Sequence, residues 1–282
     1  MQDACVVSEH QDLESRKDGN MTTDLKRLFL SSMISLPLCF PLVSAQAAST
    51  EVPRYLAIAR ELVQNISAEN NRYVLGSQFI SFPGDGTANG YSMRADCSGF
   101  LLAIFDRAGY STRSQMTFLN PSPKRKRPAA EDFVFSIETE KGFKRIQTIE
   151  DMRPGDLLAH AMLNIEDRKQ TGTTGHVFLI NSRPRQIASR KPVVAGTRQF
   201  EVSVIDSNEE HVGDDDSRLI DPSNKIAGLG MGTIRIYADS NGELVGWART
   251  FSRSSRFFSY SSRFPSDTKA RKAAVGRPST GS

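Results

Sequence analysis

The stretch DCSGFLLAIF, at residues 96–105, decides how the rest of the chain is interpreted. Asp96 is a residue type that caps helices, and the apolar run after Gly99 predicts a helix that begins near Cys97 and ends near Gly109. A helix N-terminus carries partial positive charge and free N–H groups, which favour a thiolate over a thiol. The pattern therefore indicates a reactive cysteine at the start of a helix. A buried, inert core thiol is the alternative, because free cysteine is among the most buried residue types.

A cysteine nucleophile needs a base and a group that orients the base. Of the four histidines, His176 has the most suitable setting, since it follows the flexible segment TGTTG and opens the apolar strand VFLI. The next predicted strand ends at Asp206, whose carboxylate suits the orienting role, and Asn208 is the alternative. We interpret His160 as a partly buried polar residue at the end of a strand. His211 is interpreted as a loop residue beside an acidic run.

Outside this motif, the hydrophobic pattern predicts helices first and strands afterwards. A helix is expected over residues 51–67, where apolar residues recur at steps of three and four. Strands are expected over residues 133–137, 156–160, 176–180, 201–206, 233–238 and 244–250, with further candidates in 251–260 and 271–276. This order of elements predicts an α+β domain.

The first 47 residues are expected to be absent from the mature chain. Residues 1–20 are polar and are interpreted as an extension ahead of a true start at Met21. Residues 21–47 hold a basic pair, an apolar run and small residues at their end, which is typical of a signal peptide. A membrane anchor and a lipid attachment site at Cys39 are the alternatives. We therefore expect an exported protein, periplasmic or in the cell envelope, with no stable membrane insertion and with Cys97 as its single cysteine.

Three motifs occur in the order seen in the NlpC-type family of bacterial cell-wall peptidases, which the chain resembles over roughly residues 52–210. The motifs are DCSGF at residues 96–100, RPGDLL at 153–158 and GHV at 175–177. The resemblance implies a compact papain-like α+β fold, in which N-terminal helices carrying the nucleophilic Cys pack on an antiparallel β-sheet carrying the His.

The resemblance also implies roles for individual residues. Cys97 matches the nucleophile of that family, His176 the base and Asp206 its third polar residue. Three further residues match positions around the substrate: Tyr73, which would assist the oxyanion, and Asp96 and Ser98, which would hold the peptide stem. The chain departs from the family in its long segment between Tyr73 and Cys97 and in an insertion at residues 183–197, both where substrate would enter.

The activity that the resemblance implies is hydrolysis of an amide bond in peptidoglycan stem peptides, of the type that joins D-glutamate to a diamino acid. No cofactor is implied. Two alternatives keep the fold and the same dyad: a papain-like amidase of the cysteine/histidine-dependent type, or an acyltransferase acting on lipids. A third alternative is a non-catalytic protein that binds the cell wall.

Composition and the remaining motifs exclude few classes of protein or site. With 282 residues, 38% hydrophobic, 24% charged and a net charge of +4, the chain fits a soluble globular protein. One domain is expected over residues 48–265, with a partly disordered tail at 266–282. The basic run at 121–128 is interpreted as a solvated loop, without nucleic acid as a partner. The acidic run at 214–216 is interpreted as a solvated turn, with calcium as the alternative. Zinc-ligand spacing is missing, and the GLGMG segment lacks the lysine of a phosphate loop.

Overall fold

The computed structural model describes residues 52–110, 127–164, 172–219, 226–267 and 269–279. The predicted extension, the signal peptide with its cleavage site, and most of the basic run at 121–128 lie outside these residues. All the described residues belong to one compact unit.

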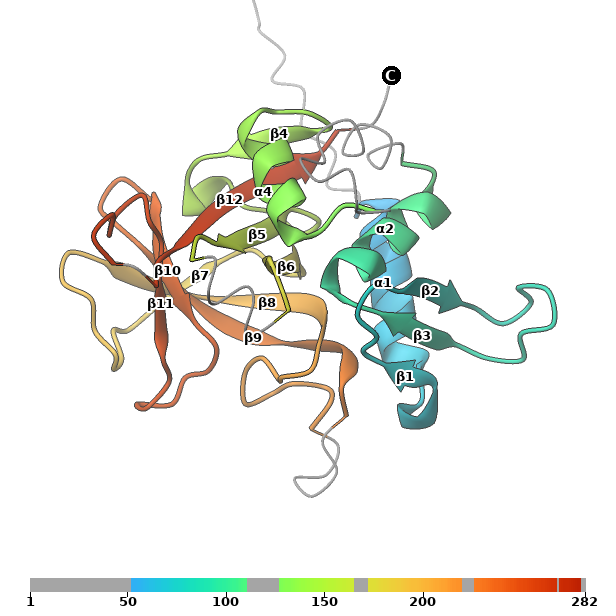
Figure 1. The fold of residues 1–282 in the computed structure, drawn as a ribbon. Coiled ribbons are helices and arrows are strands. Elements are labelled where there is room, and N and C mark those ends of the chain that lie inside the picture. The colour runs from blue at the N-terminus through green and yellow to red at the C-terminus, as the bar shows by residue number, and fades with distance from the viewer. Residues whose placement is uncertain (1–51, 111–126, 165–171, 220–225, 268, 280–282) are drawn as a thin grey trace, which may run out of the picture. The chain divides into compact units, whose positions relative to one another are not determined.

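Three α-helices occur in this part of the chain: α1 (Arg54–Asn65), α2 (Cys97–Ala108) and α4 (Ala130–Glu138). Two short 3-10 helices, η1 (Ala68–Asn70) and η2 (Ile149–Asp151), separate other elements. A small three-stranded sheet in the order β1 (Asn71–Arg72), β3 (Ser92–Ala95) and β2 (Gln78–Ser81) lies beside α1 and α2 (Figure 1). Within the described ranges, every helix is too short or too polar to cross a bilayer.

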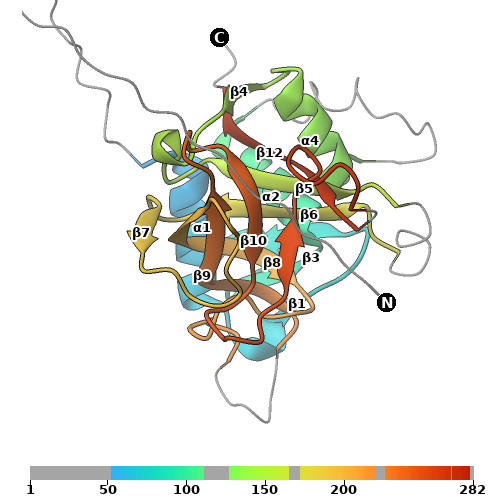
Figure 2. The same ribbon diagram turned by 90° about the vertical axis from the view of Figure 1, so that its left-hand side faces the viewer.

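A nine-stranded antiparallel sheet dominates the described chain (Figures 1 and 2). Its order is β11-β10-β9-β8-β6-β5-β12-β4, and β7 pairs with β8 off this path. The strands are β4 (Phe143–Ile146), β5 (Leu157–Met162), β6 (Gly175–Ile180), β7 (Arg185–Ile187), β8 (Arg198–Asn208), β9 (Gly228–Ala238), β10 (Leu244–Ala248), β11 (Phe257–Ser259) and β12 (Arg271–Pro278).

The sheet curls until strands far apart in its order meet. Tyr260, directly after β11, forms a parallel bridge with Arg271 at the start of β12. The Ser261 N–H also donates to the Arg271 carbonyl oxygen at 2.8 Å. Because strand side chains alternate between two faces, the curled sheet has an inner and an outer core. Leu158 and Phe178 contribute to the inner core, whereas their neighbours in the sequence pack against the helices on the outer face.

The expected papain-like α+β fold is wrong for this chain. The described residues contain more β-strand than helix, and the large sheet closes on itself instead of lying open against a helical layer. The motifs behind the expectation span only a few residues each, and they do not determine how the later strands, from β8 through β12, pair with their neighbours. Residues 133–137 illustrate the error, because they were expected as a strand and lie inside α4, which packs on β5 and β12.

The expected tail at residues 266–282 is also wrong where the structure describes it. Strand β12 lies between β5 and β4, so the domain continues beyond residue 265. Other expectations are confirmed. α1 and α2 match the predicted helices, and β5, β6, β8, β9 and β10 overlap the predicted strands with small differences at their ends.

Candidate functional site

Cys97 is the first residue of α2, as the sequence predicts. The Asp96 side chain caps the helix, with its Oδ1 accepting from the Gly99 N–H at 2.8 Å and from Ser98 Oγ at 3.0 Å. The N–H groups of Cys97 and Ser98 have no acceptor among the described residues. They therefore remain available to an anion at the positive end of the helix dipole. Gly109 ends the helix in the left-handed conformation, again as predicted.

Close packing explains the glycine of the DCSG motif. A side-chain carbon at Gly99 would collide with the backbone carbonyl oxygen of Ser77. The segment before β2 thus lies directly against the first turn of α2. Cys97 is 6% exposed and is the one free cysteine in the described part of the chain.

The structure joins His176 to Asp206, as the sequence predicts. His176 Nε2 lies 2.7 Å from Asp206 Oδ2, and the two side chains are 13% and 0% exposed. They come from neighbouring strands of the sheet, since β6 pairs with β8. Cys97 also interacts with His176, since it raises the pKa of the imidazole. Asn208, the alternative orienting residue, instead acts on Asp206, whose pKa it helps to lower.

The surroundings of His176 favour its charged form. Burial lowers the pKa of the imidazole, but the nearby Cys97 charge and hydrogen bonds with Asp206 and Cys97 outweigh it and raise the pKa to about 9. Burial likewise raises the pKa of Asp206, but the Arg218 charge and the His176 hydrogen bond together hold it below its usual value. At neutral pH His176 is therefore an imidazolium that faces the ionised carboxylate of Asp206.

Arg218 fixes the carboxylate behind the histidine, and the sequence interpretation missed it. Its Nη2 donates to Asp206 Oδ1 at 2.9 Å and to Asp216 Oδ2 at 2.6 Å, and its Nε donates to Asp216 Oδ1 at 2.8 Å. Its Nη1 donates to the Gly228 carbonyl oxygen at 2.9 Å. All three charged side chains are essentially inaccessible to solvent. We name Asp206, Arg218 and Asp216 the buried charge cluster.

This cluster corrects the expectation of a solvated acidic turn at residues 214–216. Asp216 is buried in the cluster, and Asp215 accepts hydrogen bonds from Thr233. The GLGMG segment now has a structural explanation as well. It begins β9, and a side-chain carbon at Gly230 would collide with the Arg218 guanidinium.

Arg127, from the end of the basic run, also belongs to the site. Its guanidinium pairs with Asp96 Oδ2 and donates to Ser98 Oγ at 2.9 Å. The same Asp96 oxygen accepts the Gly76 N–H at 2.8 Å. The expectation of a fully solvated loop is therefore wrong for Arg127. Both Asp96 oxygens are occupied by protein donors, which fits a residue that positions the turn before Cys97.

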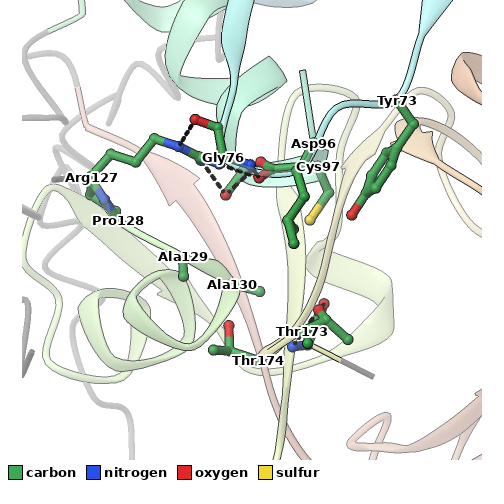
Figure 3. A pocket seen from close by; sticks show the side chains of 14 residues that line it. Tyr73, Gly76, Asp96, Cys97, Arg127, Pro128, Ala129, Ala130, Thr173 and Thr174 are labelled. Carbon is green, nitrogen blue, oxygen red and sulfur yellow. Dashed lines mark hydrogen bonds and ion pairs between the residues drawn. The ribbon is translucent and has the colours of Figure 1, made fainter. Parts of the chain in front are cut away.

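Cys97 opens into a pocket of about 400 Å³ (Figure 3). Leu75, Pro128, Ala129 and Ala130 supply apolar parts of its wall. Figure 3 shows the Tyr73 ring beside Cys97, with the hydroxyl on the same side as the sulfur. Burial and then the Cys97 charge raise the pKa of Tyr73, so its hydroxyl stays protonated and can donate. The structure thus brings Tyr73, Asp96, Cys97 and Ser98 to one pocket.

His160 is more deeply buried than expected. It lies opposite His176 in the register of β5 and β6 and is 0% exposed. Burial, followed by the charges of Arg271 and His176, lowers its pKa well below the usual value, so His160 is neutral. Its Nε2 therefore accepts from Arg271 Nη1, at 2.7 Å. His211 lies in the loop after β8.

Among the described residues, no three His, Cys, Asp or Glu side chains are grouped so that they could hold a metal ion. The candidate site consists of the Cys97 thiol, the His176 imidazole and the Asp206 carboxylate.

Comparison with known proteins gives one similarity and two negative findings. The chain is 30% identical over 212 residues to the uncharacterized protein R653 of Acanthamoeba polyphaga mimivirus, and the match covers 73% of this chain and 91% of that protein. No family model matches the chain. No solved structure matches it, so the comparisons give no support to a papain-like fold.

Proposed function

We propose that this chain, which belongs to the same family as protein R653 of Acanthamoeba polyphaga mimivirus, is a cysteine hydrolase that cleaves amide bonds through a thioester intermediate. One observation carries the proposal. A histidine that lies 2.7 Å from a buried aspartate also interacts electrostatically with a cysteine at a helix N-terminus. A nucleophile, its base and a group that orients the base are the parts that such catalysis needs.

The reaction begins from the Cys97 thiolate and the His176 imidazolium. The thiolate attacks the carbonyl carbon of the amide, and the carbonyl π electrons move to oxygen. When this intermediate collapses, the C–N bond breaks and the leaving nitrogen takes the proton from His176. A thioester on Cys97 and a neutral imidazole remain.

Water completes the cycle. His176 takes a proton from water as the oxygen attacks the thioester carbon, and the C–S bond breaks to release the carboxylic acid. The thiolate and the imidazolium are thereby restored. Asp206 remains ionised throughout and stabilises the imidazolium, since Arg218 and burial in the cluster fix its position.

Three donors are placed to stabilise the negative oxygen of the intermediate. They are the backbone N–H groups of Cys97 and Ser98 and the hydroxyl of Tyr73, which lies beside Cys97 in Figure 3. Removing one such donor typically costs about 10²–10³-fold in rate. The Tyr73 hydroxyl is the one that mutation removes without altering the backbone.

The proposed substrate is the peptide stem of peptidoglycan, with the chain acting in the cell envelope after export and removal of its signal peptide. The support is the order of the DCSG, PGD and GH motifs in the sequence. The comparisons name no substrate.

Digestion of purified peptidoglycan and soluble stem peptides by the full chain tests the proposal, with products identified by mass spectrometry. We expect new amino and carboxyl termini with the wild type and none with Cys97→Ala. A mass increase on the peptide that contains Cys97 in rapidly quenched samples would reveal the thioester. The proposal fails if no fragments form under conditions in which a known cell-wall hydrolase digests the same material, or if Cys97→Ala remains active. Transfer of an acyl group to an added amine or alcohol, without hydrolysis, would indicate an acyltransferase instead.

A further inference from the structure

A second pocket, of about 450 Å³, adjoins the Cys97 pocket on the side of His176. We name it the arginine pocket. Four residues line both pockets: Tyr73, Leu75, Thr173 and Gly175. A substrate held by Cys97 can therefore extend past His176 into the arginine pocket. The far wall comes from β10, β11 and the start of β12, where the sheet closes on itself.

The charges that line the arginine pocket do not balance. Three arginines, Arg249, Arg256 and Arg271, face two carboxylates, Glu209 and Glu210. Arg249 forms an ion pair with Glu210. Within the described part of the chain, neither Arg256 nor Arg271 has a carboxylate at ion-pair distance. Two guanidinium groups thus remain against the single carboxylate of Glu209.

The aromatic ring of Phe258 contacts both guanidinium groups without neutralising them. The central carbon of Arg271 lies 4.4 Å from the centre of the Phe258 ring, and that of Arg256 lies 5.0 Å from it. Trp247 stacks on Phe258 with ring centres 4.8 Å apart. Arg271 donates from Nη1 to the neutral His160, which adds no opposite charge. A cation held by ring faces keeps its charge and its other N–H donors for a ligand.

We propose that the arginine pocket binds an oxyanion of the substrate, a carboxylate or a phosphate, with Arg256 and Arg271 as its ligands. This inference rests on the proposed function, because it places the anionic group of the substrate beyond the bond that Cys97 attacks. A guanidinium matches the two oxygens of either anion with parallel N–H donors. The substrate class is then an amide, or a related acyl compound, that carries an acidic group on the His176 side of the scissile bond.

Trp247 provides a direct test, because it is the single tryptophan of the chain and it lines the pocket. The full chain with Cys97→Ala is titrated with N-acetylglutamate, with glycerol 3-phosphate, and with the neutral N-acetylglutamine amide, while tryptophan fluorescence is recorded. We expect a saturable change with at least one anion and none with the neutral amide. The anion that binds more tightly distinguishes a carboxylate from a phosphate substrate.

Substitutions assign the binding to the two arginines. Arg256 is exposed, so Arg256→Gln should fold normally and weaken anion binding about tenfold, the loss typical of a hydrogen bond to a charged group. Arg271→Lys keeps the positive charge but loses the planar guanidinium group. It should weaken anion binding less than Arg271→Gln does. Arg253→Gln is the matched control, since Arg253 is exposed in the same segment but does not line the pocket. Equal response to anions and the neutral amide would overturn the inference, as would unchanged binding in Arg256→Gln and Arg271→Lys.

A separate measurement keeps this inference distinct from the proposed function. Iodoacetamide labels the wild-type thiol without using the arginine pocket. An inert thiol together with selective anion binding would refute the hydrolase and leave an anion site. A reactive thiol without selective binding would refute the arginine pocket alone.

Discussion

His176 is the residue whose chemistry depends most on its neighbours. Burial lowers its pKa, but the Cys97 charge and the interactions with Asp206 and Cys97 raise it further, to about 9. Cys97→Ala removes the largest favourable contribution, and Asp206→Asn removes another. Both substitutions should lower the pKa of His176, which ¹⁵N NMR of the imidazole ring measures as a function of pH. An unchanged titration in both variants would show that these residues do not interact in solution.

The same pKa predicts an alkaline limit on hydrolysis. His176 must carry a proton to release the leaving amine, and it is protonated below about pH 9 and neutral above it. We therefore expect kcat/KM to fall as the pH rises through about 9. In Asp206→Asn the fall should begin at lower pH, because the imidazolium has lost a favourable partner. A profile that stays flat to pH 10 in the wild type would contradict the role of His176 as the acid.

Arg218 predicts a large effect on stability. Arg218→Gln leaves Asp206 and Asp216 buried without their cation, which typically costs about 3–5 kcal/mol in the free energy of unfolding. Arg185→Gln is the control, because Arg185 is 72% exposed in its ion pair with Glu201, and such pairs contribute about 0–1 kcal/mol. Urea unfolding of the three proteins measures the difference. Similar midpoints for the two variants would mean that the buried charge cluster does not support the fold.

The residues of the site were predictable to different degrees. Cys97, His176 and Asp206 could be found because each has a local signal: a capping motif, a glycine before a strand, and the end of the following strand. Arg218 has no such signal, since it becomes important only when the residues that follow β8 bring it against Asp206. Trp247 and Arg271 reach the second pocket only through closure of the sheet. Their roles depend on contacts between distant segments, which a single sequence does not report.

At the level of elements, the start of α2 depends on close packing against the segment before β2. Gly99→Ala should force the Ser77 backbone away and destabilise the protein by about 1–3 kcal/mol, the usual cost of overpacking. It should also slow iodoacetamide labelling of Cys97, because Cys97 lies in the same helical turn. Gly90→Ala is the matched control, since a side-chain carbon there meets no atom within 4 Å. Equal stability and equal labelling rates in the two variants would contradict this account.

Periodicity predicted the strands better than it predicted α4. Residues 133–137 read FVFSI, an apolar run that fits a buried strand or a buried helix equally well. The acidic residues just before it, Glu131 and Asp132, lie in the first turn of the helix, where they favour the helix dipole. These acidic residues indicate a helix start, but the strands predicted after residue 137 favoured the interpretation as a strand. Residues 271–276 were a predicted strand and lie in β12, whereas the four-residue β4 was not predicted and pairs with β12, which is distant in the chain.

At the level of the whole molecule, the sheet depends on its last strand. β12 pairs with β5 on one side and β4 on the other, and its first residue bridges to Tyr260. A chain truncated after Ala270 would leave the edges of both partner strands unpaired and part of the inner core open. We expect it to lose cooperative thermal unfolding in circular dichroism. Lys272→Gln, a polar change on the exposed side of β12, is the control and should unfold like the wild type. Cooperative unfolding of the truncated chain would show that β12 is dispensable.

The position of β12 also has a consequence for how the chain is made. Its partner β5 is translated more than a hundred residues earlier, so the sheet around His176 can close only after β12 has been synthesised. Pairings this distant in sequence form slowly, because a long loop must be ordered first. A nascent chain that has not yet reached β12 therefore lacks Arg271 and, with it, one wall of the arginine pocket.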